Sequence, residues 1–119
     1  MTDLCTSDFG RTDMELVKQV EEHVGKAAEK FYKTTLFRSD TLLLGLNCLE
    51  PGQSQLPHDH THQDKFYFVV EGNGRFWLGE ERIIASAGEV VWVPAGVVHG
   101  VVNESDIRLT LLVGIAPSP

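Results

Sequence analysis

Residues 88–103 read GEVVWVPAGVVHGVVN, and this stretch carries the strongest structural information in the chain. Two apolar runs of β character, Glu89–Val93 and Val97–Val102, flank the turn sequence Pro94-Ala95-Gly96. The turn can bring the second run back across a sheet, and His99 follows it directly in that run. We therefore expect His99 to lie on a strand that has just reversed direction, where it can meet residues from elsewhere in the chain.

Similar short runs fill the chain from Lys30 onward. They are rich in Val, Leu, Phe and Trp and are separated by turn sequences such as Gly72-Asn73-Gly74. The predicted strands are Phe31–Phe37, Thr41–Leu49, Gln55–His58, Lys65–Glu71, Arg75–Leu78, Arg82–Ser86, Glu89–Val93, Val97–Val102 and Ile107–Gly114. This pattern predicts an all-β sandwich or barrel over residues 30–115. Apolar residues occupy both parities of several runs, so we expect part of the outer surface to meet a helix or another subunit.

Residues 1–29 precede the predicted barrel and contain one helical pattern, near residues 13–24. Thr12-Asp13-Met14-Glu15 has the spacing of a capping box, and Leu16, Val17, Val20 and Val24 then repeat at helical spacing. A helix this short needs tertiary packing, so we expect it to cover one end of the barrel, with exchange between subunits as the alternative. At the other end, residues 116–119 are expected to form a disordered tail, since prolines oppose strand pairing.

The composition narrows the function classes. A chain of 119 residues is expected to form one domain, and 17 acidic against 10 basic side chains give a net charge of −7, which argues against nucleic-acid binding. The apolar runs are far shorter than the roughly 18 residues of a membrane span, and the N-terminus lacks the order of a signal peptide. Cys5 and Cys48 form neither a disulfide framework nor a thiolate metal site. We expect a cytoplasmic domain with reduced thiols and no nucleic-acid or membrane partner.

Three of the five histidines lie within residues 58–62, which read HDHTH. Residues two apart in a strand project from the same face, so His58 and His60 can direct their imidazoles at one point. His99 is the candidate for a third donor, and imidazole is a common ligand of transition metals. His62 shares the parity of the first two, but a bend at Thr61 would leave it at the rim. A lone histidine is more often solvated, whereas this spacing favours a metal site.

Glycines and prolines around these histidines complete two longer patterns. Gly52, His58 and His60 have the spacing G-x5-H-x-H, and the segment runs on to Gly72. A second pattern, G-x5-P-x-G-x2-H-x3-N, is formed by Gly88, Pro94, Gly96, His99 and Asn103. On these two motifs the sequence resembles the cupin superfamily, in its small single-domain bacterial type, over roughly residues 30–115. The resemblance implies a jelly-roll β-barrel, often dimeric, with a divalent metal near the mouth, and carries the ligand role to His58, His60 and His99.

The sequence departs from the family pattern at the fourth ligand, which the family supplies as a glutamate. Counting back from Gly72 gives Lys65, whose ammonium has no lone pair to donate, and counting forward from His60 gives Asp64. Three alternatives remain open: a site of three histidines only, a bulge that lets Asp64 or Gln63 reach the metal, or no physiological metal.

These residues suggest a chemistry. Three neutral imidazoles leave the full charge of a divalent ion uncompensated, so the pocket should prefer an anionic small molecule. We expect one Zn, Fe, Ni, Mn or Cu ion per chain, and Lys65, Tyr67 and Asp64 as candidate acid–base groups, with a barrel-core role as the other reading of Tyr67. The predicted function is a metal-dependent enzyme of the dioxygenase, isomerase or lyase type. The alternatives are a non-catalytic module that binds or senses a small ligand, and a structural cupin whose metal is incidental.

Other residues of these motifs are expected to be structural. Gly52, Gly72 and Gly96 lie in predicted tight turns, where a positive φ is useful. Asn103 is expected to bond to backbone at the end of a strand instead of touching the metal. Cys48 is most simply a small buried apolar residue.

Overall fold

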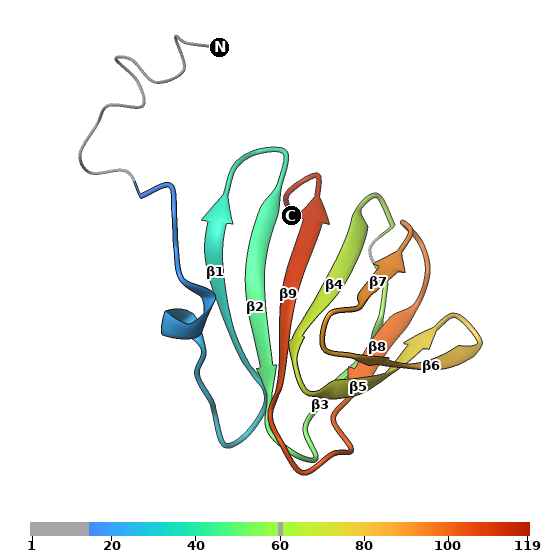
Figure 1. The fold of residues 1–119 in the computed structure, drawn as a ribbon. Helices are drawn as coiled ribbons and strands as arrows, with labels where there is room; N and C mark the ends of the chain where they lie inside the picture. The colour runs from blue at the N-terminus through green and yellow to red at the C-terminus, as the bar shows by residue number, and fades with distance from the viewer. Residues whose placement is uncertain (1–14, 60) are drawn as a thin grey trace, which may run out of the picture.

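The computed structural model describes residues 15–59 and 61–119 and consists almost entirely of β-strands (Figure 1). The strands are β1 (Tyr32–Arg38), β2 (Leu43–Leu49), β3 (Ser54–His58), β4 (Asp64–Glu71), β5 (Asn73–Leu78), β6 (Glu81–Ser86), β7 (Val90–Val93), β8 (His99–Val102) and β9 (Leu109–Ala116). Each corresponds to one of the predicted runs, with small shifts at the ends.

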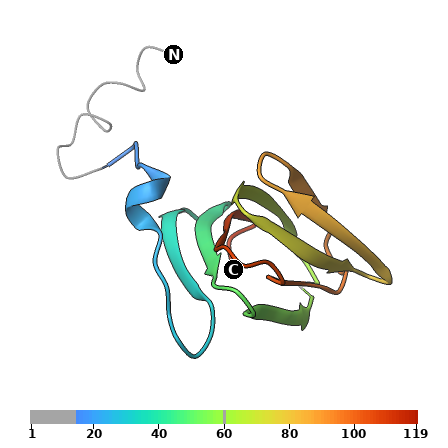
Figure 2. The same cartoon turned by 60° about the horizontal axis from the view of Figure 1, so that its bottom comes forward.

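The strands form two antiparallel sheets that face each other. One has five strands in the order β1-β2-β9-β4-β7, and the other has four in the order β3-β8-β5-β6 (Figures 1 and 2). The chain passes from the five-stranded sheet to the four-stranded sheet after β2, β4 and β7 and returns after β3, β6 and β8, which is the winding of a jelly roll. The predicted all-β jelly-roll barrel is therefore confirmed.

The inner faces of the two sheets enclose the core. Side chains alternate along each strand, so that in β4 Lys65, Tyr67 and Val69 are buried between less buried neighbours. The fully or almost fully buried apolar residues include Leu49, Tyr67, Val69, Phe76, Val91, Val93, Val101, Leu109, Leu111 and Val113. Large apolar side chains thus fill one end of the barrel, whereas Gly45 and Asn47 occupy the inward positions of β2 toward the other end.

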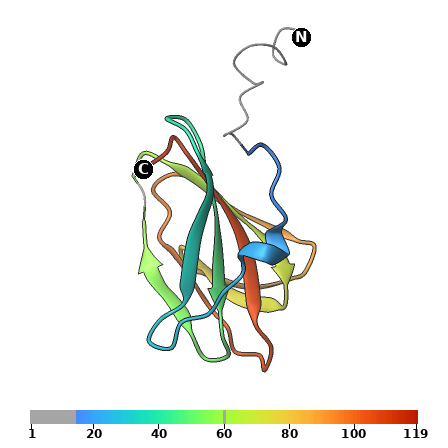
Figure 3. The same cartoon turned by 90° about the vertical axis from the view of Figure 1, so that its left-hand side faces the viewer.

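The predicted N-terminal helix is wrong for the residues that the structure describes, while residues 13 and 14 lie outside them. Only a single 3-10 turn, Val20–His23, is present, and residues 15–19 are not helical (Figure 3). Leu16 and Val17 are 56% and 83% exposed, so the apolar stripe finds no surface to cover, and a short helix is not stable without one. Lys18 instead donates a hydrogen bond to the carbonyl oxygen of Leu36 at 2.7 Å, tying the segment to β1. No helix in this described part has the length or hydrophobicity of a bilayer-crossing segment.

The last residues of the chain have contacts where the sequence led us to expect a disordered tail. After β9, the Ser118 amide donates to the carbonyl oxygen of Asp40 at 3.3 Å. The Gln63 side chain donates to the carbonyl oxygen of Pro117 at 2.9 Å, and Arg38 donates to that of Pro119. These bonds hold the tail between the β1–β2 turn and the start of β4.

Candidate functional site

Pairing between β3 and β8 brings two of the predicted histidines together. His58 and His99 are cross-strand partners, their ring centroids are 4.3 Å apart, and the ring planes are inclined by 52°. β3 is an edge strand, so it tolerates Pro57 and a shift of register just before His58. β8 is paired on both sides, since His99 also lies opposite Leu78 of β5, and this fixes the position of the His99 ring.

The backbone sets which nitrogen of each ring carries the lone pair. Nδ1 of His58 donates to the carbonyl oxygen of Leu56 at 3.0 Å, and Nδ1 of His99 donates to that of Val97 at 2.8 Å. A carbonyl oxygen only accepts, so the proton is on Nδ1 and the lone pair on Nε2 in both neutral rings. Burial lowers the pKa of His58 below its ordinary value, and the positive charge of Lys65 lowers it further against the opposing effect of the Leu56 bond. Neutral imidazoles fixed by a carbonyl acceptor are what a transition metal requires.

The remaining histidines of the 58–62 segment do not extend this pair in the described structure. His60 lies outside the described residues, and His62 is exposed, as expected for a residue at the rim. Within residues 15–59 and 61–119, no cluster of three or more His, Cys, Asp or Glu side chains is arranged to hold a metal. His58 and His99 are thus the described part of the predicted ligand set, and their donors fit a transition metal.

The structure does not bring the candidate fourth ligands to the histidines. Asp64 is exposed at the start of β4, where strand alternation directs it away from the inward-facing Lys65. Its Oδ1 accepts a hydrogen bond of 3.0 Å from the backbone amide of Ala95, and the amide group of Gln63 bonds to Pro117. The role of Asp64 or Gln63 as a fourth ligand therefore has no support in this geometry.

The side chain of Lys65 points into the barrel and not toward its outer surface. Its side chain is buried, with 3% of the residue exposed, and its ammonium lies 4.7 Å from the ring centroid of Tyr67. Within the part of the chain that the structure describes, this ammonium forms no salt bridge and donates no hydrogen bond. Burial lowers the pKa of Lys65 to about 8, and repulsion from Lys33 contributes. A buried ammonium without a counter-charge among the described residues is unusual, because removing a charge from water is costly.

Tyr67 belongs to the core, in agreement with the structural reading of this residue. It is fully buried, and its hydroxyl donates to Oε1 of Gln55 at 2.6 Å. Burial raises the pKa of this phenol far above its ordinary value, so the group stays protonated and remains a donor. Since Oε1 takes the Tyr67 proton, the orientation of the Gln55 amide is fixed.

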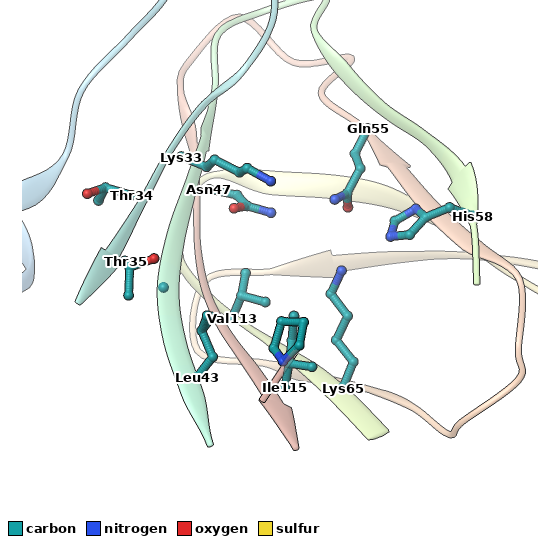
Figure 4. Close-up of a pocket in the computed structure, with 12 residues that line it drawn as sticks. Lys33, Thr34, Thr35, Leu43, Asn47, Gln55, His58, Lys65, Val113 and Ile115 are labelled. Atoms are coloured by element: carbon teal, nitrogen blue, oxygen red, sulfur yellow. The ribbon is translucent and has the colours of Figure 1, made fainter. Parts of the chain in front are cut away.

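A cavity of about 660 Å³ opens beside His58 (Figure 4). Its polar lining comes from Lys33, Thr34, Thr35, Asn47, Gln55, His58 and Lys65, and its apolar lining from Leu43, Val113 and Ile115. No aspartate or glutamate is among the described residues that line it. Although the chain as a whole is acidic, the cavity is cationic.

Sequence reasoning missed five of the seven polar side chains in this lining, and the three of them that carry an ammonium or amide group are Lys33, Asn47 and Gln55. Each comes from a different strand, and only the folded topology brings them together. One sequence signal was available for Asn47, because it is the single polar side chain in the otherwise apolar β2 run LLGLNCL. A polar residue at an inward position of a buried strand needs a partner, and here that position faces the cavity.

Several motif residues are structural, as expected. Gly52, Gly72 and Gly96 have φ angles of 89°, 85° and 86°. Asn103 is fully buried and donates to the carbonyl oxygens of Leu49 and Ile107, at 2.9 and 2.8 Å. Cys48 is fully buried as well, and burial raises the pKa of its thiol. These residues hold the barrel together around the site.

One glycine supports the site by letting two strands approach. A Cβ on Gly100 would lie 2.7 Å from the carbonyl oxygen of Gln55, closer than real Cβ contacts allow. Gly100 follows His99 directly, so the absence of a side chain there permits β3 to close on β8 beside the paired histidines.

Comparison with known proteins agrees with this architecture. The sequence pattern of the cupin domain matches residues 45–115. A protein of Streptomyces coelicolor, described as uncharacterized, is 35% identical over 88 residues, which cover 72% of this chain and 81% of that protein. The crystal structure of TT1209 from Thermus thermophilus has a TM-score of 0.84 at 38% identity, covering 87% of this chain and 98% of that one. A Klebsiella pneumoniae protein with a double-stranded β-helix domain has a TM-score of 0.83 at 20% identity, covering 87% and 91%, and shares the fold. The chain belongs to the cupin family.

Proposed function

We propose that this cupin is a metal-dependent enzyme that acts on a small anionic organic molecule. The observation that carries the proposal is the placement of His58 and His99, with their lone pairs on Nε2, beside a cavity that contains the buried ammonium of Lys65. We assign the metal to His58, His60 and His99, with one Zn, Fe, Ni, Mn or Cu ion per chain.

The residues around the cavity have separate roles in this proposal. When bound, the metal supplies Lewis acidity that polarises an oxygen of the substrate. Lys65 faces the same cavity and attracts an anionic group, and a pKa of about 8 lets it exchange a proton near neutral pH. Tyr67 acts as a positioning residue, because its hydroxyl holds the Gln55 amide and the tyrosine itself lies in the core. Asp64 ties a loop to β4 and is not among the proposed ligands.

The second candidate is a binding or sensing module without chemistry. It is favoured by the neutral amides of Asn47 and Gln55, which recognise a ligand but transfer no proton. The two functions differ in turnover: an enzyme converts a bound acid, whereas a binding module only gains thermal stability from it.

Metal analysis followed by activity assays tests the proposal. The protein is stripped of metal, loaded with each of the five metals and analysed, together with His99→Ala and the control His23→Ala, whose histidine lies in the 3-10 turn outside the barrel. We expect one ion per chain in the wild type and the control, and loss of the ion in His99→Ala. Loaded protein is then assayed with hydroxy and keto acids for oxygen uptake and isomerisation. Retention of metal by His99→Ala contradicts the proposed site, and metal binding with ligand-induced stabilisation but no turnover supports the binding module.

We also propose that the protein is a homodimer. Trp92 and Val90 of edge strand β7 are 57% and 62% exposed, and their cross-strand partners Phe66 and Phe68 extend the apolar surface onto β4. An apolar surface of this kind is typical of an interface. Light scattering is expected to give a dimer for the wild type and for Trp92→Phe, and a monomer for Trp92→Ser; a monomeric wild type contradicts the proposal. The cytoplasmic location expected from the sequence stays a prediction.

A further inference from the structure

We propose that Lys33 and Asn47 form a second anion-binding subsite in the cavity, and that the ligand is a small dicarboxylate held at both ends. For the end of the ligand that lies beside His58 and Lys65, the inference rests on the proposed function. It adds a distinct set of residues for the other end, on β1 and β2.

The two residues are placed together by strand pairing. Lys33 of β1 and Asn47 of β2 are direct cross-strand partners on the face of the sheet that lines the cavity. Figure 4 shows the Lys33 ammonium extending into the cavity next to the Asn47 amide. Gly45 is the next inward residue of β2 and also lines the cavity; a Cβ there would lie 2.9 Å from the carbonyl oxygen of Thr34 on the neighbouring strand.

The Asn47 amide has no hydrogen-bond partner within the part of the chain that the structure describes. Asn47 is only 7% exposed, yet among the described residues its side chain makes no hydrogen bond. Neither amide atom of Asn47 is among the described fully buried atoms that lack a hydrogen bond, so the amide is open to the cavity, where water or a ligand can satisfy it. An inward-facing amide left open at a cavity wall is therefore a recognition group for something that enters the cavity.

The charge of the cavity indicates what enters. Lys33, which is exposed, and Lys65, which is buried, are the two charged side chains of its described lining, and they are close enough to repel each other. Neither lysine forms a salt bridge within the described structure, and the described lining contains no aspartate or glutamate; Pro119, the last residue, also lines the cavity and accepts a hydrogen bond from Arg38. In a chain with a net charge of −7, two uncompensated ammonium groups in one cavity fit a ligand that carries two negative charges.

The two lysines extend into the cavity from strands on opposite sides of it, β1 and β4. β1 and β4 are separated by β2 and β9 in the sheet order, so their backbones lie up to about 14 Å apart at about 4.8 Å per strand. Long side chains reach inward from both sides, and the Gln55 amide, fixed by Tyr67, faces the space between them from the opposite sheet (Figure 4). A cavity of about 660 Å³ holds a dicarboxylate of a few carbons stretched between these groups.

Calorimetric titration with matched pairs of acids tests the subsite. Succinate, glutarate and adipate are compared with butyrate, valerate and hexanoate, which have the same chain lengths but one carboxylate. Wild type and the control Lys30→Gln, an exposed lysine outside the cavity, are expected to bind at least one diacid about tenfold more tightly than its partner, as one charge-assisted hydrogen bond allows. Lys33→Gln should abolish this preference while leaving monoacid affinity within about twofold of wild type, and Lys33→Arg should restore it. Asn47→Leu should weaken diacid binding, with thermal unfolding used to establish that each variant is folded.

Every titration is repeated on metal-loaded and chelated protein, which separates this inference from the proposed function. A diacid preference that depends on Lys33 in chelated protein supports the subsite even if no metal binds or no turnover is found. The subsite is overturned if Lys33→Gln keeps the wild-type preference, if wild type does not distinguish diacids from monoacids, or if it binds none of the six acids. Those results leave metal binding by the histidines unaffected.

Discussion

Replacing Lys65 by methionine is expected to stabilise the protein at neutral pH. Lys65 keeps a positive charge inside the barrel without a salt bridge among the described residues, and methionine has a similar shape without the charge. Lowering a lysine pKa from 10.5 to about 8 corresponds to about 3 kcal/mol at about 1.4 kcal/mol per pH unit. The attraction of the ammonium to the Tyr67 ring, worth about 1 kcal/mol, is lost at the same time. Because the ammonium faces a cavity and not close-packed carbon, we expect a net gain of about 1–2 kcal/mol in the free energy of unfolding.

The sign of the pH dependence follows from the lowered pKa. Between pH 8 and pH 10.5 the unfolded chain binds more protons at this lysine than the folded chain does, so wild-type stability from this group rises with pH through that window. Below pH 8 the charged form is present in both states and the penalty on the folded state is complete. The advantage of Lys65→Met should therefore be largest at pH 7 and should shrink toward pH 10.

Urea unfolding followed by tryptophan fluorescence measures both effects. Wild type, Lys65→Met and Lys26→Met are compared at pH 7 and pH 10 in the presence of chelator, Lys26 being an exposed lysine before β1. The reasoning is refuted if Lys65→Met is less stable than wild type at pH 7, or if its advantage is the same at both pH values. A gain of equal size in Lys26→Met would show that the effect comes from net charge and not from the buried site.

Three further predictions concern the metal site and the turns. Metal affinity, measured by competition with a chromogenic chelator, should fall below about pH 6, because the histidine ligands must be neutral to bind. The lowered pKa of His58 should move this fall to lower pH. A constant affinity from pH 7 to pH 4.5 would contradict this prediction. Asp64→Asn should keep one metal per chain, because the asparagine oxygen can still accept the hydrogen bond from the Ala95 amide. Loss of the metal in this variant would indicate that Asp64 is a metal ligand. Gly72→Ala should destabilise the fold by about 2–4 kcal/mol, because φ is 85° and the added Cβ would clash with the backbone carbonyl oxygen of Arg108. Gly88→Ala, with φ of 94° but open space around it, is the control and should lose about 1 kcal/mol; equal losses would contradict the steric argument.

The barrel was predictable because its information is local. Each strand is a short alternating run between turn residues, and the positive φ of glycines such as Gly72 can be anticipated from the turns themselves. The N-terminal helix failed for the opposite reason. Leu16, Val17, Val20 and Val24 have helical spacing, but whether a stripe of apolar residues folds as a helix depends on a tertiary partner. In the structure Leu16 and Val17 are exposed.

The site was predictable only in part. The turn before His99 and the resemblance to cupins made this residue the candidate partner of His58, but the pairing of β3 with β8 is what brings the two rings together. The direction of Lys65 required the register of β4, because a shift of one residue would exchange it with Asp64. Lys33, like the other cavity residues on separate strands, became recognisable only when the sheet order placed it opposite Lys65.

The hydrogen bond between Asp64 and the Ala95 amide has a consequence for how this cupin could be tuned. Ala95 lies in the turn Pro94-Ala95-Gly96. Val97 follows this turn directly, and its carbonyl oxygen accepts the hydrogen bond that orients the ring of His99. The carboxylate of Asp64, on the outside of the barrel, thus helps to fix the orientation of the His99 imidazole on the inside. Surface substitutions near Asp64 would then change the affinity of the proposed metal site without altering any of its ligands.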